Sequence, residues 1–192
     1  ALSENMIYRF KIPGVELPEM EGFLTDGLRS LLKTIPASNI CEKTLRYPGT
    51  AERLAFLREI GLFSTGPVKV KGQKVVPRDV FAALAYPMMK LGEKEKEFTF
   101  LQVDINGYLK GKPILHRYRM YDERDEKTGY TSMARTTGFT CVIMARLMAE
   151  GLVDMPGVHA PEAIGDKPEV VARFIAEMEK RGVKVTKEVS GS

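Results

Sequence analysis

Cysteine and histidine are scarce in this sequence, which contains two of each among 192 residues. Cys41 and Cys141 stand far apart in apolar segments, and they form no CxxC or other zinc-binding spacing. We therefore expect two buried free thiols in a reducing compartment. Because His116 and His159 are the only histidines, a histidine-rich metal site is excluded.

Long apolar runs and nucleotide-binding motifs are also missing. No stretch approaches the roughly 20 apolar residues that span a bilayer, and no signal peptide precedes the first predicted strand. We therefore expect a cytoplasmic protein that binds no membrane. Neither GxGxxG nor GxxxxGKS/T occurs, so no dinucleotide or nucleoside triphosphate can be placed by motif. No Ser-His-Asp or Cys-His arrangement is identifiable.

Charge of one sign does not accumulate in any segment. The 29 Lys+Arg are scattered among 25 Asp+Glu, for a net charge of +4, and this distribution is typical of a solvated surface. The segment 117–121 places Arg117, Arg119 and Tyr121 on one side of a predicted strand. A solvated sheet face explains this pattern more simply than a nucleic-acid surface, so we expect no nucleic-acid partner.

Hydrophobic periodicity predicts alternating strands and helices. Strands are expected at 6–12, 41–47 and 183–185, and helices after Thr25 or Asp26, from Thr50 to Gly61, from Pro77, from 132 to 150 and from 167 to 181. A short hairpin should turn at Lys71-Gly72, and a long one, 98–121, at Asn106-Gly107. Core positions are expected to include Val68, Val70, Met88, Met89, Met144 and Met148. The pattern favours an α+β (α/β-like) fold with a mixed β-sheet and a long hairpin, covered by helices.

The end of the predicted strand 41–47 is unusual, because it carries Arg46 and Tyr47 and stops at Pro48-Gly49. An arginine at a strand end is suited to bind a carboxylate through two parallel hydrogen bonds. Tyr47 adds a hydroxyl group on a rigid ring. The alternative is a strand-to-helix turn with an arginine paired to a nearby acid, and the sequence alone leaves both interpretations open.

Two further polar clusters lie at predicted helix starts. Thr25 and Asp26 either cap a helix, with Asp26 paired to Arg29, or contact a polar ligand. In the stretch 130–139, hydroxyl groups crowd the first turns of a helix, where backbone N–H groups favour a carboxylate or phosphate. A hydroxyl-rich cap is the structural alternative. The hydroxyl-bearing residues of this stretch include Thr131, Ser132, Thr136 and Thr137.

Four stretches occur here in one order: FLTDGLRSLL (23–32), EKTLRYPGTAERLAFLREIGLF (42–63), TGYTSMARTTGF (128–139) and GVHAPE (157–162). Together they resemble the saccharopine dehydrogenase-like family, in the part beyond its nucleotide-binding domain, and within it they look most like the lysine 6-dehydrogenases. Family members are often dimers with an N-terminal Rossmann domain, which this chain lacks. The resemblance implies a substrate-binding and dimerisation domain at 1–165. The helix and strand at 166–192 would return to the Rossmann domain in a full-length enzyme.

The resemblance also implies an activity. The full enzyme would use NAD or NADP, bound mainly by the absent domain, to oxidise the lysine ε-amine to 2-aminoadipate 6-semialdehyde, and this chain alone would be inactive. Arg46 would pair with the substrate α-carboxylate, and Asp26 is the candidate general base unless the base lies on the missing half. The residues expected to contact the substrate are Thr25, Arg46, Tyr47, Thr136 and Thr137. No cofactor or metal ligand is expected in this chain.

Alternative functions stay open at this point. A non-catalytic dimerisation or interaction module would use the long hairpin without binding substrate. Saccharopine and carboxynorspermidine dehydrogenases share the amino-acid end of the substrate. Saccharopine carries further carboxylates and should need more than one arginine.

Overall fold

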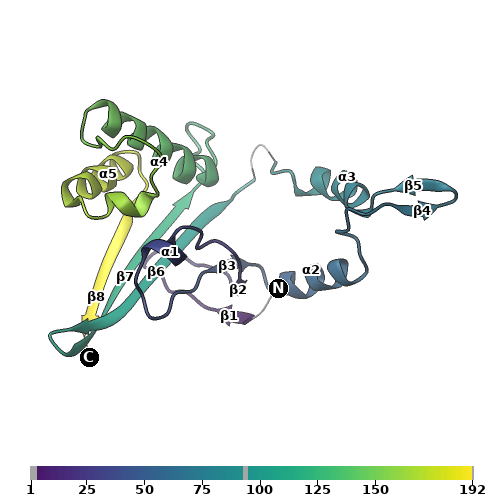
Figure 1. Ribbon diagram of the computed structural model, residues 1–192, viewed down its shortest axis with the longest axis horizontal. Helices are drawn as coiled ribbons and strands as arrows, with labels where there is room; N and C mark the ends of the chain where they lie inside the picture. Colours follow the sequence, from purple (N-terminus) through teal and green to yellow (C-terminus); the bar gives the residue numbers. More distant parts are fainter. Residues whose placement is uncertain (1–3, 93–94, 192) are drawn as a thin grey trace. The chain divides into compact units, whose positions relative to one another are not determined.

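The computed structural model describes residues 4–92 and 95–191, and the chain divides into two compact units on either side of Gly92. The first unit contains β1 to β5 and α1 to α3, and the second contains β6 to β8, α4, α5 and a short 3₁₀ helix (Figure 1). Each unit combines helices with antiparallel sheets, which confirms the α+β class. The strands described here form three separate sheets, and every strand pair within them is antiparallel.

The first sheet is built from three short strands in the order β1-β2-β3. They are β1 (Met6–Tyr8), β2 (Met20–Leu24) and β3 (Lys43–Arg46). Strand β3 confirms the predicted strand at 41–47, and β1 is shorter than the predicted 6–12. Strand β2 was not predicted, because Glu21 and Gly22 interrupt any apolar alternation, yet both are buried.

Two of the helices of the first unit follow these strands. α1 (Leu31–Thr34) is a single turn with Ser30 in the cap position, so the prediction that Thr25 or Asp26 caps it is wrong. α2 (Thr50–Glu59) ends before Gly61, whose φ of +79° suits a helix stop, as predicted. Thr50 is its first residue and not its cap: the Thr50 hydroxyl donates to the Tyr47 carbonyl at 2.6 Å.

The remainder of the first unit is a small hairpin and a helix. β4 (Val68–Val70) and β5 (Gln73–Val75) turn at Lys71-Gly72, where φ is +52° and +86°, which confirms the predicted turn. α3 (Pro77–Met89) begins at its proline as predicted. The predicted burial was wrong here. A hairpin of three-residue strands has too little area to cover its own apolar side chains, and the last two residues of α3 are exposed as well. The exposed residues include Val68, Val70, Met88 and Met89.

The second unit is organised by a long antiparallel ribbon. β6 (Phe98–Leu109) pairs with β7 (Lys112–Glu123), and β8 (Val185–Gly191) pairs with the other edge of β7. The long hairpin was predicted, but its turn lies at Lys110-Gly111, with φ of +52° and +78°. Asn106-Gly107 lies inside β6, opposite Ile114 and Leu115. The predicted strand 183–185 begins later and runs further than expected.

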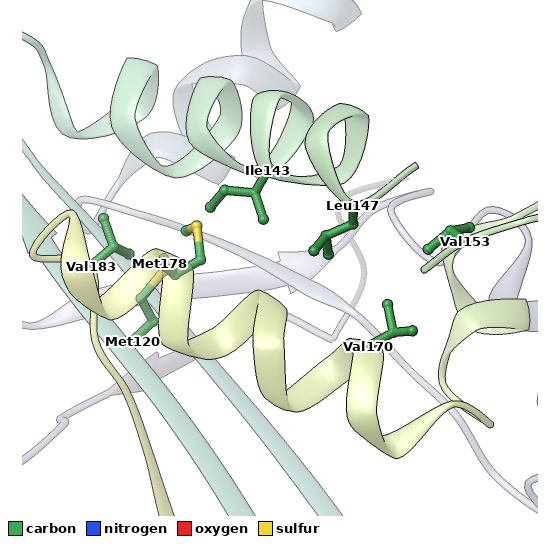
Figure 2. Close-up of a cluster of buried hydrophobic side chains, with 7 residues drawn as sticks. All are labelled: Met120, Ile143, Leu147, Val153, Val170, Met178 and Val183. Carbon is green, nitrogen blue, oxygen red and sulfur yellow. The ribbon is translucent and has the colours of Figure 1, made fainter. Parts of the chain in front are cut away.

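Helices of the second unit pack on one end of this ribbon (Figure 1). α4 (Ser132–Ala149) and α5 (Pro168–Lys180) match their predicted ranges to within about two residues, and the 3₁₀ helix η1 (Pro161–Ile164) lies between them in the chain. The core beneath them is the cluster in Figure 2: Met120, Ile143, Leu147, Val153, Val170, Met178 and Val183. α5 and β8 belong to this unit. That they would pack on a Rossmann domain in a longer protein stays a prediction.

Several residues predicted to be core lie outside the cluster. Cys41 and Cys141 are both exposed free thiols, so their predicted burial is wrong. Met148 is exposed, whereas Met144 packs against the cluster.

The apolar face of the β6–β7–β8 sheet is covered at one end only. Met120 and Val185, which pair across β7 and β8, are part of the helix-covered core or pack against it. Further along the same face, Val103, Ile105 and Val189 are 43–55% exposed.

Candidate functional site

The turn after β3 is held in place by a buried glutamate. Glu21 on β2 is 4% exposed, and its carboxylate accepts hydrogen bonds from the backbone N–H of Ala51 at 2.9 Å and from Asn5 Nδ2 at 2.7 Å. The Ala51 bond, more than any other contact, lowers the pKa of Glu21 against the opposing effect of burial. Glu21 therefore fills the N-terminal end of α2, where an anion is favoured by the helix dipole.

Arg46 and Tyr47 project from this anchored turn. Arg46 is the last residue of β3 and pairs with Glu21 across the sheet. Its side chain is exposed, and Nη1 donates to the Leu45 carbonyl at 2.7 Å. Among the described residues no acidic side chain forms an ion pair with Arg46, so the paired-arginine alternative is not supported. Tyr47 is 61% exposed, and Gly49 with φ of +84° turns the chain into α2.

Thr25 and Asp26 lie at the other end of the same strand pair. Leu24 pairs with Lys43, whereas Glu21 pairs with Arg46. Thr25 lies one residue beyond Leu24, and a strand advances about 3.3 Å per residue, so the four residue steps between Glu21 and Thr25 separate the two groups of predicted site residues by roughly 13 Å. Asp26 is exposed in a turn and forms an ion pair with Arg29 at 3.2 Å.

The Thr25 hydroxyl makes contacts that sequence reasoning missed. It donates to the Glu42 carboxylate and lies 3.0 Å from the Thr44 hydroxyl, which itself donates to Glu42 at 3.1 Å. No local pattern predicted this cluster, because Thr25 and Glu42 are 17 residues apart in the sequence. Alternation of polar residues at 42, 44 and 46 was the available signal.

Thr136 and Thr137 lie on α4 in the second unit. Their hydroxyl groups donate to the helix carbonyls of Ser132 at 2.9 Å and Met133 at 2.5 Å. Since each hydroxyl proton is used within the helix, each oxygen can accept a hydrogen bond from a ligand but cannot donate one. These residues therefore suit an ammonium group better than the carboxylate or phosphate considered from the sequence.

The N-terminus of α4 is already occupied by side chains of this chain. Thr131 is the cap, and its hydroxyl accepts from the backbone N–H of Ala134 at 3.1 Å. The backbone N–H of Ser132, which is fully buried, donates to Glu97. These contacts support the structural interpretation of the hydroxyl-rich stretch.

A buried ion pair fixes the same helix to the ribbon. Arg135 on α4 contacts Asp122 on β7 at 3.1 Å, with side chains 10% and 4% exposed, and it also reaches Asp125 at 3.3 Å. Arg135 Nη2 donates to the Arg181 carbonyl after α5 at 3.1 Å. Most of the stretch 130–139 is therefore tied up in structural contacts.

The basic face of the ribbon is neutralised by neighbouring acids. Arg117 forms a bidentate ion pair with Asp104 through two hydrogen bonds of 2.8 Å. Arg119 lies 3.6 Å from the Glu188 carboxylate. This arrangement is that of a solvated sheet face. In residues 4–92 and 95–191, no cluster of three or more histidine, cysteine, aspartate or glutamate side chains could hold a metal. Over the same residues, no helix is both long and apolar enough to cross a membrane.

Comparison with known proteins identifies the family. Residues 3–183 match the family model described as the saccharopine dehydrogenase C-terminal domain, and the chain belongs to this family. One curated relative is the L-glutamate-forming, NADP(+) saccharopine dehydrogenase of Schizosaccharomyces pombe, which is 28% identical over 134 residues. The match covers 69% of this chain but only 28% of that enzyme, so the chain corresponds to a minor part of its relative. The resemblance to saccharopine dehydrogenase-like proteins is confirmed.

Proposed function

We propose that this chain is the substrate-binding part of an NAD(P)-dependent amino-acid dehydrogenase that oxidises the ε-amine of lysine. The observation that carries the proposal is Arg46, an exposed arginine on a turn anchored by Glu21, without an acidic partner in the described part of the chain. A guanidinium in this position is suited to bind the substrate α-carboxylate through two hydrogen bonds.

The contribution of this chain is binding and orientation. Its sequence contains no dinucleotide-binding motif, so we assign no cofactor contact to its residues and place NAD or NADP on a separate nucleotide-binding domain. That cofactor accepts a hydride from the carbon next to the amine. Tyr47 offers a hydroxyl group beside Arg46, and a role of Thr136 and Thr137 of the second unit in substrate binding stays a prediction.

Calorimetric titration of L-lysine into the chain, with and without the nucleotide domain and NAD, tests the proposal. We expect Arg46→Ala to weaken binding about 10- to 100-fold, the equivalent of one or two charge-assisted hydrogen bonds. The matched control is Arg58→Ala, which removes another exposed arginine of the same unit from α2. If Arg46→Ala and Arg58→Ala bind lysine equally well, the assignment of Arg46 is wrong.

Saccharopine is the second candidate substrate, because the relative from Schizosaccharomyces pombe is a saccharopine dehydrogenase. A second guanidinium is available for its extra carboxylates. The Arg53 side chain reaches back over Gly49, so that a Cβ on Gly49 would lie 3.6 Å from the guanidinium carbon. Loss of saccharopine binding in Arg53→Ala, with lysine binding unchanged, would favour saccharopine over lysine.

We also propose that the protein is cytoplasmic and forms a homodimer, and the exposed apolar face of the β6–β7–β8 sheet supports the dimer. A non-catalytic dimerisation module would share this face but would not bind amino acids. Sedimentation analysis combined with the lysine titration separates the two functions, because only the module would form a dimer without measurable lysine binding.

A further inference from the structure

Three oxygen-bearing side chains meet on one face of the first sheet, and none of them belongs to a helix cap or an ion pair in the described part of the chain. Thr25 extends from the end of β2, Thr44 lies in β3, and Glu42 immediately precedes β3. Their oxygens are mutually within hydrogen-bonding distance: Thr25 to Glu42, Thr44 to Glu42 at 3.1 Å, and Thr25 to Thr44 at 3.0 Å. Glu42 and Thr44 are half-buried, and Thr25 is exposed.

This cluster has one proton too few for its three contacts. Each threonine hydroxyl supplies a single proton, and an ionised carboxylate supplies none. If both hydroxyl groups donate to Glu42, the two threonine oxygens face each other at 3.0 Å with only lone pairs between them. A donor or cation placed against the three oxygens would relieve this repulsion, so the cluster is suited to bind a group with several N–H donors.

Arg46 lies on the same face as the cluster. Cross-strand pairs share a face, and residues at i, i+2 and i+4 of a strand point the same way. Glu42, Thr44 and Arg46 therefore form a row that begins with a carboxylate and ends with a guanidinium, roughly 13 Å apart at the backbone. Both long side chains can lean inward, and an extended lysine spans about 7 Å between its carboxylate carbon and its ε-nitrogen.

We propose that the oxygens of Thr25, Glu42 and Thr44 bind the ε-ammonium of the substrate whose carboxylate pairs with Arg46. The inference rests on the proposed lysine-binding function. It makes Glu42, and not Asp26, the carboxylate that lies beside the substrate amine. A primary ammonium carries three N–H donors, which match the three oxygens. Asp26 is committed to Arg29 in an exposed turn, whereas no cation pairs with Glu42 in the described residues.

Gly27 supports the position of Glu42. A Cβ at residue 27 would lie 2.7 Å from Glu42 Cδ, so any larger residue would displace the carboxylate. The close approach brings the turn after β2 against the start of β3, where the cluster forms.

Binding of ligands that lack one charged group of lysine distinguishes the ammonium site at Thr25, Glu42 and Thr44 from the carboxylate site at Arg46. L-norleucine lacks the ε-amine of lysine, and cadaverine lacks its carboxylate. We expect Glu42→Gln to weaken the binding of L-lysine and cadaverine about tenfold, through loss of one charged hydrogen-bond partner, and to change L-norleucine binding by less than about twofold. Arg46→Ala should weaken L-lysine and L-norleucine and leave cadaverine unchanged. Glu52→Gln, an exposed change in the first turn of α2, is the control.

The outcomes are distinct. If Glu42→Gln weakens L-lysine and L-norleucine equally, or changes neither, the ammonium site is wrong even when Arg46→Ala abolishes binding as proposed. If the unchanged chain binds none of the three ligands, with or without the nucleotide domain and NAD, the proposed function fails and the inference fails with it. Thr44→Val is the second variant, because it removes one oxygen and keeps the Glu42 charge. It should weaken L-lysine about threefold relative to L-norleucine if the cluster binds the amine.

Discussion

Replacement of Glu21 by glutamine tests how the strand-to-helix turn is held. Glu21 is a buried carboxylate in the middle of the first sheet, and its partners are the N-terminal backbone of α2 and Asn5. Glu21→Gln keeps the size of the side chain and one acceptor oxygen but removes the negative charge. Because Ala51 and Asn5 donate to different oxygens of Glu21, glutamine can keep only one of the two hydrogen bonds, as a neutral one, and its NH2 group faces the other donor. The favourable interaction with the helix dipole is also lost.

The expected loss of stability is about 2 kcal/mol. The bond that remains loses roughly 1 kcal/mol when it becomes neutral, and the loss of the other bond costs at least as much. The loss should depend on pH. Because the folded-state pKa of Glu21 is lowered, its stabilising contribution is complete above the unfolded-state value of about 4.3. It disappears as pH falls through the folded-state pKa, so wild type and variant should converge in acid.

Hydrogen exchange of the Ala51 amide is the most direct measurement, because this amide donates to Glu21. At pH 7 its protection should fall by roughly 30-fold in Glu21→Gln if local opening follows the free-energy change. Urea unfolding followed by circular dichroism gives the global value. Glu52→Gln should change stability by less than about 0.5 kcal/mol. Equal effects of the two substitutions, or a difference that persists at pH 2, would refute the role given to Glu21.

Three further predictions concern the second unit. Gly111→Ala should destabilise the chain by about 1 kcal/mol in urea unfolding, because φ is +78° there. Gly107→Ala in the middle of β6 should change stability by less than about 0.5 kcal/mol. The reverse order would mean that the turn is not at Lys110-Gly111. Hydrogen bonds from Arg181, and then from Lys180, lower the pKa of Glu177 to about 2. An NMR titration should show this value, and Arg181→Gln should raise it; a pKa near 4 in the unchanged chain would contradict the ion-pair geometry. Arg135→Met should cost about 3–5 kcal/mol in urea unfolding because it leaves a buried carboxylate without its partner, and a loss below about 1 kcal/mol would show that the pair is dispensable.

Local sequence signals predicted the helices well and the strand connections unevenly. The ranges of α4 and α5 follow from apolar periodicity, since one face of each helix packs into the core. The turn of the long hairpin could not be predicted from turn residues alone. Asn106-Gly107 is a strong turn signal, but a turn at Lys110-Gly111 gives each strand twelve residues and pairs Phe98 with Glu123. The sum of cross-strand contacts overrides the local preference.

Prediction of the site was limited by long-range contacts. The exposure of Arg46 and Tyr47 at a strand end agrees with the pattern of the strand and the Pro48-Gly49 stop. Glu21 could not be found from that pattern, because its partner Ala51 lies 30 residues away in the chain. Alternation placed Glu42 beside Thr44, but its contact with Thr25, 17 residues away, could not be predicted. Convergence of Arg46 with Thr136 and Thr137 stays a prediction.

The partly covered sheet of the second unit has a consequence for how this chain behaves in solution. Val103, Ile105 and Val189 form an apolar surface that is exposed to water on the β6–β7–β8 sheet, and any partner that covers it binds the folded state alone. The stability measured for the isolated chain should therefore rise with chain concentration if copies associate. The dependence of the thermal unfolding midpoint on concentration then reports the affinity of that association. An unfolding series over a hundredfold range of protein concentration would reveal the affinity of this surface before any partner is known.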